Sequence, residues 1–249
     1  VPGGVAAKLC GVPLVIHEQN AVAGLSNRIL AKLASRVLYA FPKAFGDENG
    51  LVGNPVRADI AALPAPQERF AGRSGSLKLL VTGGSLGADI LTRLLPEALA
   101  LLPAEQRPQV RHQSGRGKLE GLRQRYAEAG VQAECSEFID DMAEAYAWAD
   151  VVICRSGALT VCELAAVGTP AIFVPFQHKD QQQYLNAKYL ADVGAAKIVQ
   201  QNELNADVLV DFLEKIDRET LLAMAIKAKE MSAPLAAKRV ADVIVENAK

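Results

Sequence analysis

Residues 150–166 read DVVICRSGALTVCELAA, and this stretch decides the fold prediction. Its first four residues are typical of a buried strand, the next polar residues of a turn, and residues 159–166 of a helix with Val161, Leu164 and Ala165 on one face. The first backbone N–H groups of a helix lack internal partners, and the helix dipole favours negative charge. A strand that leads through such a turn into a helix therefore predicts an anion site.

Thr160 and Glu163 are polar residues near the start of this predicted helix. A carboxylate one turn into the helix can accept hydrogen bonds from a ribose diol while phosphates lie at the helix start. The alternative interpretation is a capping box, in which the two side chains only satisfy backbone donors at the helix end. Their spacing alone fits both interpretations.

A second loop of the same kind favours the ligand-binding interpretation. Residues 82–88 read TGGSLGA, after a strand-like run at 77–81 and before a helix-like run at 89–95. Glycines let a backbone approach phosphate closely, although Gly83, Gly84 and Gly87 do not have the spacing of a dinucleotide fingerprint. Two such loops at strand carboxyl ends together predict a nucleotide or nucleotide-sugar site.

The rest of the chain alternates in the same rhythm. We expect strands near 77–82, 109–113, 131–135, 150–154, 170–174 and 196–199, and helices near 87–102, 117–129, 140–148, 159–167 and 181–193. Three closing helices are expected at 205–215, 218–232 and 234–247. Before them we expect helices at 4–10 and 23–34, strands at 13–17 and 36–40, an extended segment at 51–57 and a linker at 64–75. The alternation predicts an α/β fold with a parallel sheet covered on both faces.

Composition excludes several classes of protein. The 249 residues are 50% hydrophobic and carry a formal net charge of −1, which lacks the basic footprint of a nucleic-acid binder. The four cysteines form no C-x-x-C pair and fit buried thiols in a reducing compartment. No apolar run is long enough to cross a bilayer, so we expect a cytoplasmic protein. Without an Asp-x-Asp motif, we expect neither a metal nor another cofactor.

Several motifs together resemble the MurG family of bacterial glycosyltransferases. The matching runs are HEQN at 17–20, GNPVR at 53–57, GGSLGA at 83–88, HQSG at 112–115, EFIDDM at 137–142, RSGALTVCE at 155–163 and PFQHKDQQQ at 175–183, with Asn186. They span nearly the whole chain. The resemblance implies a GT-B fold, with residues 1–56 as the carboxyl-terminal part of the amino-terminal acceptor domain. Residues 57–230 would then form the donor-binding domain, and residues 231–249 a helix that returns to the first domain.

The resemblance also implies a function and its residues. The family transfers N-acetylglucosamine from UDP-GlcNAc to lipid I, by metal-independent inversion, to make lipid II. Arg57 and Ser85 would contact the diphosphate, Ile139 the uracil, and Glu163 the ribose. The segment Ala158, Leu159, Thr160, Val161 and Cys162 would lie against the nucleotide and its phosphates. Gln183, with Gln182 and Asn186 nearby, would bind the sugar, and Asn20 would reach the donor from the other domain.

One family motif has no counterpart in the sequence. The Gly-Gly-Thr-Gly-Gly-His loop, with its candidate catalytic His, is expected before Val1, so we expect no catalytic residue in this chain and an amino-terminally truncated, inactive donor-binding half. The full-length protein would bind lipid I at the inner face of the cell membrane. Two alternatives stay open: a UDP-sugar epimerase of the same fold, for which Glu18 is the candidate acid–base group, and a non-enzymatic donor-binding subunit.

Overall fold

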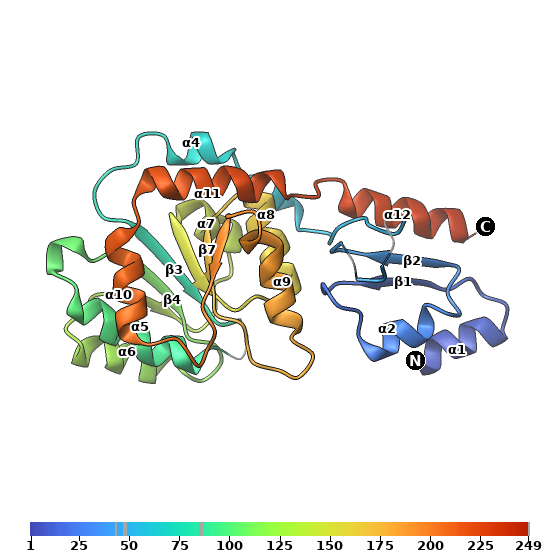
Figure 1. Ribbon diagram of the computed structural model, residues 1–249, viewed down its shortest axis with the longest axis horizontal. Coiled ribbons are helices and arrows are strands. Elements are labelled where there is room, and N and C mark those ends of the chain that lie inside the picture. Colours follow the sequence, from blue (N-terminus) through green and yellow to red (C-terminus); the bar gives the residue numbers. More distant parts are fainter. Residues whose placement is uncertain (43, 47–48, 85–86, 249) are drawn as a thin grey trace.

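The computed structural model describes residues 1–42, 44–46, 49–84 and 87–248. In this part the strands form two parallel sheets, one of six strands and one of two. The six-stranded sheet and its helices are called the six-stranded unit below, and the two-stranded sheet with its helices the two-stranded unit (Figure 1).

The six-stranded unit follows the predicted alternation of strands and helices. Its strands are β3 (Lys78–Thr82), β4 (Gln109–Gln113), β5 (Glu134–Ser136), β6 (Val151–Cys154), β7 (Ala171–Phe173) and β8 (Ala196–Ile198). Its helices are α5 (Asp89–Leu101), α6 (Leu119–Glu128), α7 (Met142–Trp148), α8 (Ala158–Val167), α9 (Gln182–Ala191), α10 (Ala206–Lys215) and α11 (Arg218–Glu230), with a 3-10 turn at Ala104–Gln106.

The strand order β5-β4-β3-β6-β7-β8 is that of a doubly wound nucleotide-binding fold. Successive residues of β3 point to opposite faces, so Leu79 packs with α5, α6 and α10 and Leu80 with α7, α8 and α9. The order reverses between β3 and β6, where the chain leaves the two strands in opposite directions along the sheet. Ligands of such folds bind outside the strand carboxyl ends at this switch point.

The two-stranded unit contains α1 (Pro2–Leu9), β1 (Val15–Glu18), α2 (Leu25–Leu30) and β2 (Arg36–Tyr39). α2 is shorter than the helix predicted at 23–34, because a turn replaces it after residue 30. The final helix α12 (Ala236–Asn247) begins against residues 51–53, which follow this sheet, and runs beside it in Figure 1.

The linker predicted at 64–75 is wrong in part. The segment contains α4 (Pro66–Phe70), preceded by the short α3 (Ala58–Ala61), and α4 packs against α11. Pro66 occupies the first position of α4, where a missing N–H costs nothing, and Phe70 is buried. Pro64 and Pro66 led to the prediction of turns. The buried side chain of Phe70 instead packs this segment against the core.

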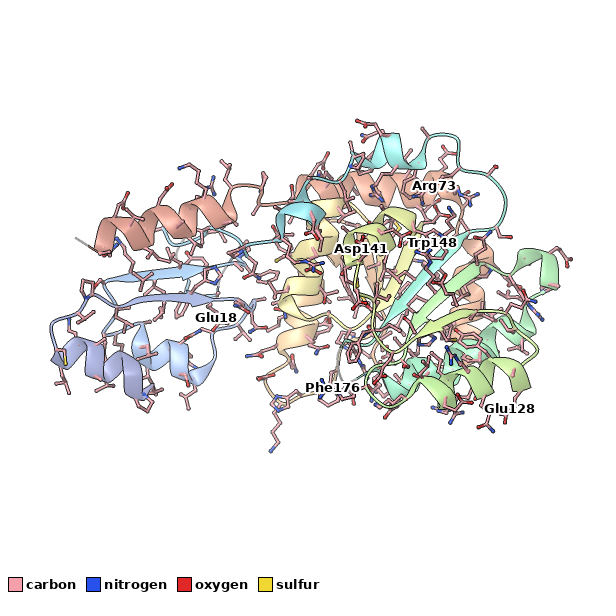
Figure 2. The ribbon with its side chains drawn as sticks, turned by 180° about the vertical axis from the view of Figure 1, so that it is seen from behind. Glu18, Arg73, Glu128, Asp141, Trp148 and Phe176 are labelled. Atoms are coloured by element: carbon pink, nitrogen blue, oxygen red, sulfur yellow. The ribbon has the colours of Figure 1, made fainter. Side chains whose placement is uncertain are left out.

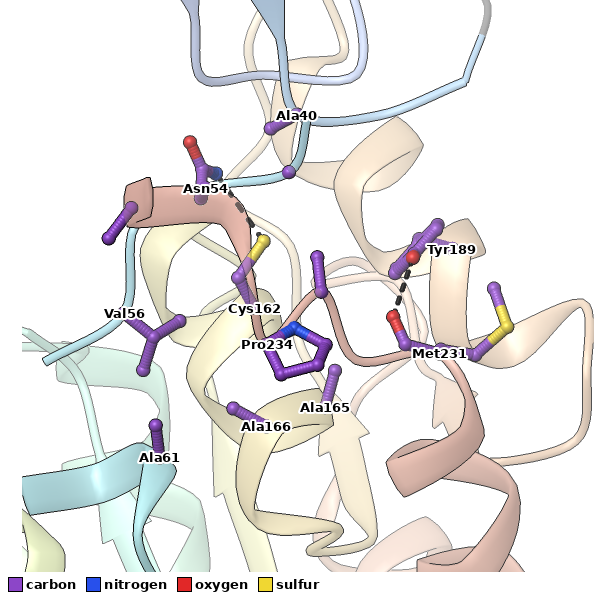
Figure 3. Close-up of a pocket in the computed structure, with 13 residues that line it drawn as sticks. Ala40, Asn54, Val56, Ala61, Cys162, Ala165, Ala166, Tyr189, Met231 and Pro234 are labelled. Carbon is purple, nitrogen blue, oxygen red and sulfur yellow. Dashed lines mark hydrogen bonds between the residues drawn. The ribbon is translucent and has the colours of Figure 1, made fainter. Parts of the chain in front are cut away.

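The chain crosses between the two units twice, at residues 52–57 and 231–236. The crossings touch at Gly53, whose φ is +87° and where any Cβ would overlap Ala233 and approach Ala236. His17 Nε2 lies 2.9 Å from the Gly53 oxygen and fixes the first crossing to β1. Ala40, Asn54, Cys162, Tyr189 and Met231, among others, line a small pocket here, called the hinge pocket (Figure 3).

Candidate functional site

The amino end of α8 is open, as the anion-site prediction requires. β6 is buried along its whole length and delivers the chain to Gly157, the N-cap of α8, and among the described residues no side chain caps the amino end of this helix. Val161, Leu164 and Ala165 are buried and anchor the helix in the core. Backbone N–H groups of the first turn, together with the helix dipole, therefore suit a phosphate.

The capping-box interpretation of Thr160 and Glu163 is wrong. Thr160 is the third residue inside α8, not its N-cap, and Glu163 lies in the second turn. The Oε2 atom of Glu163 instead accepts a 3.0 Å hydrogen bond from the hydroxyl of Tyr146, which is buried on α7. Burial raises the pKa of Glu163, and the Tyr146 hydroxyl and the charge of Arg57 partly offset that shift. Its carboxylate keeps further acceptor positions for a ligand.

Glu163 lines a pocket at the switch point of the sheet, called the switch-point pocket. Its volume is about 420 Å³, within the range of small-molecule sites. It is lined by residues from the ends of β3 and β4, from the loops and helices that follow β3, β5 and β6, and from α9: Thr82, Gly83, Gly84, Gln113, Phe138, Ile139, Met142, Tyr146, Arg155, Gly157, Thr160, Glu163 and Gln183. Four residues predicted from the sequence thus meet here: Ile139, Thr160, Glu163 and Gln183.

Gln183 and Arg155 are held in this pocket by bonds within the chain. Gln183 Oε1 accepts a 2.9 Å hydrogen bond from the Phe176 N–H. Arg155 donates to the Val174 oxygen and to Gln201 Oε1, and its guanidinium lies 5.6 Å from the Phe176 ring centre. Phe176 is labelled on the long loop before α9 in Figure 2. Among the described residues, the walls of the pocket carry one cation, Arg155, and two amide side chains, Gln113 and Gln183.

Other residues predicted around α8 do not line this pocket. Val161 is fully buried in the core, Ala158 is nearly so, and Leu159 is 46% exposed. Cys162 faces the hinge pocket, where its Sγ accepts a 3.3 Å bond from Asn54 Nδ2, as Figure 3 shows. Burial raises the pKa of the Cys162 thiol to about 11, so the thiol stays protonated at neutral pH.

The remaining predicted residues lie at the rim or between the two units. Arg57 is half-exposed beside Asp59, with 3.7 Å between their charged groups. Asn20 and Asn186 contact each other through a 3.2 Å hydrogen bond that joins the two-stranded unit to α9. Gln182 begins α9, and its Nε2 lies near Gly24. Ser85 lies outside the described residues.

Sequence reasoning missed Tyr146, Gln113, Met142, Phe138 and Arg155 as pocket residues. Arg155 and Gln113 stand inside the quoted motifs, directly after β6 and at the end of β4, so their place at strand ends was a usable signal. Tyr146 gave none, because it lies 17 positions before Glu163 and reaches it only through the packing of α7 on α8.

The opposite end of α8 is capped by cations from other helices. Arg69 of α4 donates Nη2 to the oxygens of Val167 and Gly168, and Lys229 of α11 donates to the Ala166 oxygen. Positive charge at a helix carboxyl end complements the dipole. Gly168 ends the helix with φ +71°, and any side chain there would overlap Pro66 and the Ala225 oxygen. α8 is thus capped at its carboxyl end and open at its amino end.

A doubly wound sheet with an open helix end at its switch point, and a carboxylate one turn inside that helix, is the geometry of a nucleotide-binding α/β fold. Comparison with known proteins identifies the family. Residues 78–240 match the glycosyltransferase family 28 C-terminal domain, and residues 1–39 match the family's N-terminal domain. The chain belongs to glycosyltransferase family 28 and is a homologue of MurG.

Individual relatives support the same assignment. The chain is 67% identical to the UDP-N-acetylglucosamine--N-acetylmuramyl-(pentapeptide) pyrophosphoryl-undecaprenol N-acetylglucosamine transferase of Mannheimia succiniciproducens, over 99% of this chain and 70% of that protein. The crystal structure of Acinetobacter baumannii MurG matches with a TM-score of 0.88 at 41% identity, over 98% of this chain and 70% of that one. UDP-GlcNAc 2-epimerase from Neisseria meningitidis shares the fold alone, with a TM-score of 0.62 and 12% identity, over 98% of this chain and 72% of that one.

Proposed function

We propose that the chain binds UDP-GlcNAc in the switch-point pocket as the donor half of an inverting N-acetylglucosaminyltransferase that converts lipid I to lipid II. The observation that carries the proposal is the open amino end of α8 with Glu163 one turn inside it, in a pocket of about 420 Å³. The activity of the relatives supports it, because they transfer N-acetylglucosamine from UDP-N-acetylglucosamine to an undecaprenol-linked acceptor. Because that acceptor is a membrane lipid, the reaction would take place at the membrane surface.

In the proposed mechanism, the start of α8 stabilises the leaving UDP. The acceptor hydroxyl attacks the anomeric carbon and gives its proton to the catalytic base, the bond to the diphosphate breaks, and the configuration inverts. Negative charge develops on the departing UDP, where the N–H groups at the start of α8 and the guanidinium of Arg57 would stabilise it. Glu163 would accept bonds from the ribose hydroxyls, Ile139 would contact the uracil, and Gln183 would contact the sugar.

Calorimetry with UDP and UDP-GlcNAc tests the binding step. We expect residues 1–249 to bind both, with the same affinity in magnesium and in EDTA, because the proposed anion contacts are N–H groups and a guanidinium. Within the described residues, no group of three or more His, Cys, Asp or Glu side chains is arranged to hold a metal ion. A strict requirement for magnesium would contradict the proposal.

We further propose that residues 1–249 alone do not transfer the sugar. The two candidate bases of β1 are engaged within the chain: Glu18 is 3% exposed and accepts four hydrogen bonds, and His17 contacts Gly53. Family resemblance assigns the catalytic base to a loop that this sequence does not include. A radiolabelled transfer assay, run beside a full-length relative, tests this; turnover at the relative's rate would refute it.

The epimerase alternative lacks a supporting observation. It needs acid–base carboxylates in the cleft, and Glu18, its candidate, is buried in a complete set of hydrogen bonds at the end of β1 (Figure 2). The likeness to epimerases concerns the fold alone.

As for the membrane, none of the helices in the described part of the chain combines the length and the apolar character that crossing a bilayer requires.

A further inference from the structure

Asn186 is fully buried on α9 and joins three segments of the chain. Its Oδ1 accepts a 2.8 Å hydrogen bond from the backbone N–H of Ala21. Its Nδ2 donates to Asn20 Oδ1 and to the backbone oxygen of Ser156, both at 3.2 Å. The two N–H groups and the oxygen of a side-chain amide can make these three bonds together. The donors of Asn186 are therefore directed at the protein and away from a sugar.

The first of these segments, the loop after β1, is fixed by Glu18. Its carboxylate accepts hydrogen bonds from the backbone N–H groups of Asn20 and Gly24, at 2.9 and 3.0 Å, and from Asn27 Nδ2 at 2.8 Å. Burial raises the pKa of Glu18, but these bonds outweigh it and lower the pKa overall, so the group stays ionised. A buried carboxylate with this many donors holds residues 20–24 in one conformation, which presents Asn20 and Ala21 to α9.

Another of these segments is the turn that opens α8. Ser156 is fully buried, its backbone oxygen accepts from Asn186, and its hydroxyl donates to the Gln183 oxygen at 2.8 Å. Gly157, the next residue, is the N-cap of α8 and lines the switch-point pocket, as does Gln183. The turn before α8 and the first turn of α9 are thus joined at the pocket wall.

We infer that Asn186 is a positioning residue that fastens the loop after β1 to the open end of α8, through Asn20, Ala21 and Ser156, and that it does not contact the sugar. The inference deepens the proposed function and rests on it. It replaces the sugar contact that the family resemblance implied for Asn186. Loss of the fastening displaces the turn that carries the phosphate-binding N–H groups, so it weakens UDP and UDP-GlcNAc equally.

Calorimetry on Asn186→Ala tests the ligand side of the inference. We expect the affinities for UDP and UDP-GlcNAc to fall by the same factor, about 3- to 10-fold, the range for one or two net hydrogen bonds. A loss confined to UDP-GlcNAc would show a sugar contact and overturn the inference. Asn205→Ala removes the same amide from the N-cap of α10, outside the pocket, and should leave both affinities unchanged. Asn186→Ser is the second variant if the alanine variant does not fold.

Hydrogen exchange tests the fastening without any nucleotide. The Ala21 N–H donates to Asn186, so its exchange should accelerate at least about tenfold in Asn186→Ala and stay unchanged in Asn205→Ala. Unchanged exchange of Ala21 in a folded Asn186→Ala would overturn the inference. If the wild-type chain binds no UDP, the proposed function fails, while this exchange measurement still decides whether the fastening exists.

Discussion

Parallel strands alternate with helices in both units, but the strand and helix residues of the two units are buried to different extents. β6 and β7 of the six-stranded unit are buried at every residue, whereas β1 alternates between half-buried and buried positions. All seven helices of the six-stranded unit contribute buried residues, but among the described residues α1 and α2 contain none. Leu9 and Leu25 are 82% and 73% exposed.

The difference teaches that local pattern and burial are separate properties. Val15 and Ile16 pair in parallel with β2, yet half of the residues of β1 and of β2 are not fully buried. Hydrophobic burial is the dominant favourable term in folding, so the six-stranded unit should contain most of the stability of the chain. Four measurements test this contrast.

Core truncation should separate the units most strongly. Leu80 of β3 is fully buried against the helices α7 and α8, so Leu80→Ala should lower the free energy of unfolding by about 2–5 kcal/mol. Leu9→Ala, the matched change on α1, should alter it by less than about 0.5 kcal/mol. Urea unfolding followed by circular dichroism measures both. Equal costs would refute the contrast.

Nucleotide affinity should depend on the six-stranded unit and not on the two-stranded unit. Glu163→Ala should cost about 1.5–3 kcal/mol of UDP affinity, the range for hydrogen bonds to a charged group. Leu25→Ala, in the two-stranded unit, should leave the affinity unchanged. Calorimetry with UDP and its 2′-deoxy analogue decides whether Glu163 contacts the ribose: the wild type should distinguish the two ligands, and the variant should not.

Acid should act on the six-stranded unit first. Burial lowers the pKa of His112 to about 3, so below its usual value of 6.5 the unfolded chain binds a proton that the folded chain does not. Stability should therefore fall by about 2 kcal/mol between pH 6.5 and pH 5. The lowered pKa of Glu18 acts later, because its contribution is present above pH 4.5 and is lost only below that value.

Urea midpoints measured from pH 7 to pH 4.5 check this order. His112→Gln keeps a partner for the Tyr126 hydroxyl, which lies 2.9 Å from His112 Nδ1, and should flatten the profile between pH 6.5 and pH 5. A variant with the wild-type slope would mean that another group titrates in that window.

Helix capping gives the smallest effect. Asp217 caps α11 by accepting a 2.8 Å bond from the Thr220 N–H, so Asp217→Ala should cost about 1 kcal/mol. α2 begins at Gly24 with no side-chain cap in the described part of the chain, and Ser26→Ala should change stability by less than about 0.5 kcal/mol. Thermal unfolding of the pair resolves this difference.

The sequence predicted the elements of the six-stranded unit well, because their local signals agree with their burial. The strand predicted near 150–154 is β6 (Val151–Cys154), and the helix predicted from 159 begins at Ala158. Other features depended on distant residues. α4 was missed because Phe70 finds its place only in the core, where it packs with residues of other segments.

For the site, the sequence identified the loops but not the direction of each side chain. Thr160 and Glu163 line the pocket, while Cys162, between them, faces the hinge. One residue along a helix turns a side chain by about 100°, and the face that meets a ligand depends on the neighbours of α8. The roles of the predicted site residues and the division at residues 56 and 230 stay predictions.

The two crossings that touch at Gly53 have a mechanical consequence. Two bodies joined by a pair of chains that meet at one place cannot slide apart at that place without stretching a chain. Gly53 sets the spacing, since its missing Cβ is what lets Ala233 and Ala236 approach. An insertion of one residue in either crossing would displace this contact between Gly53 and Ala233. The length of these two segments is therefore under a geometric constraint that neither unit imposes by itself.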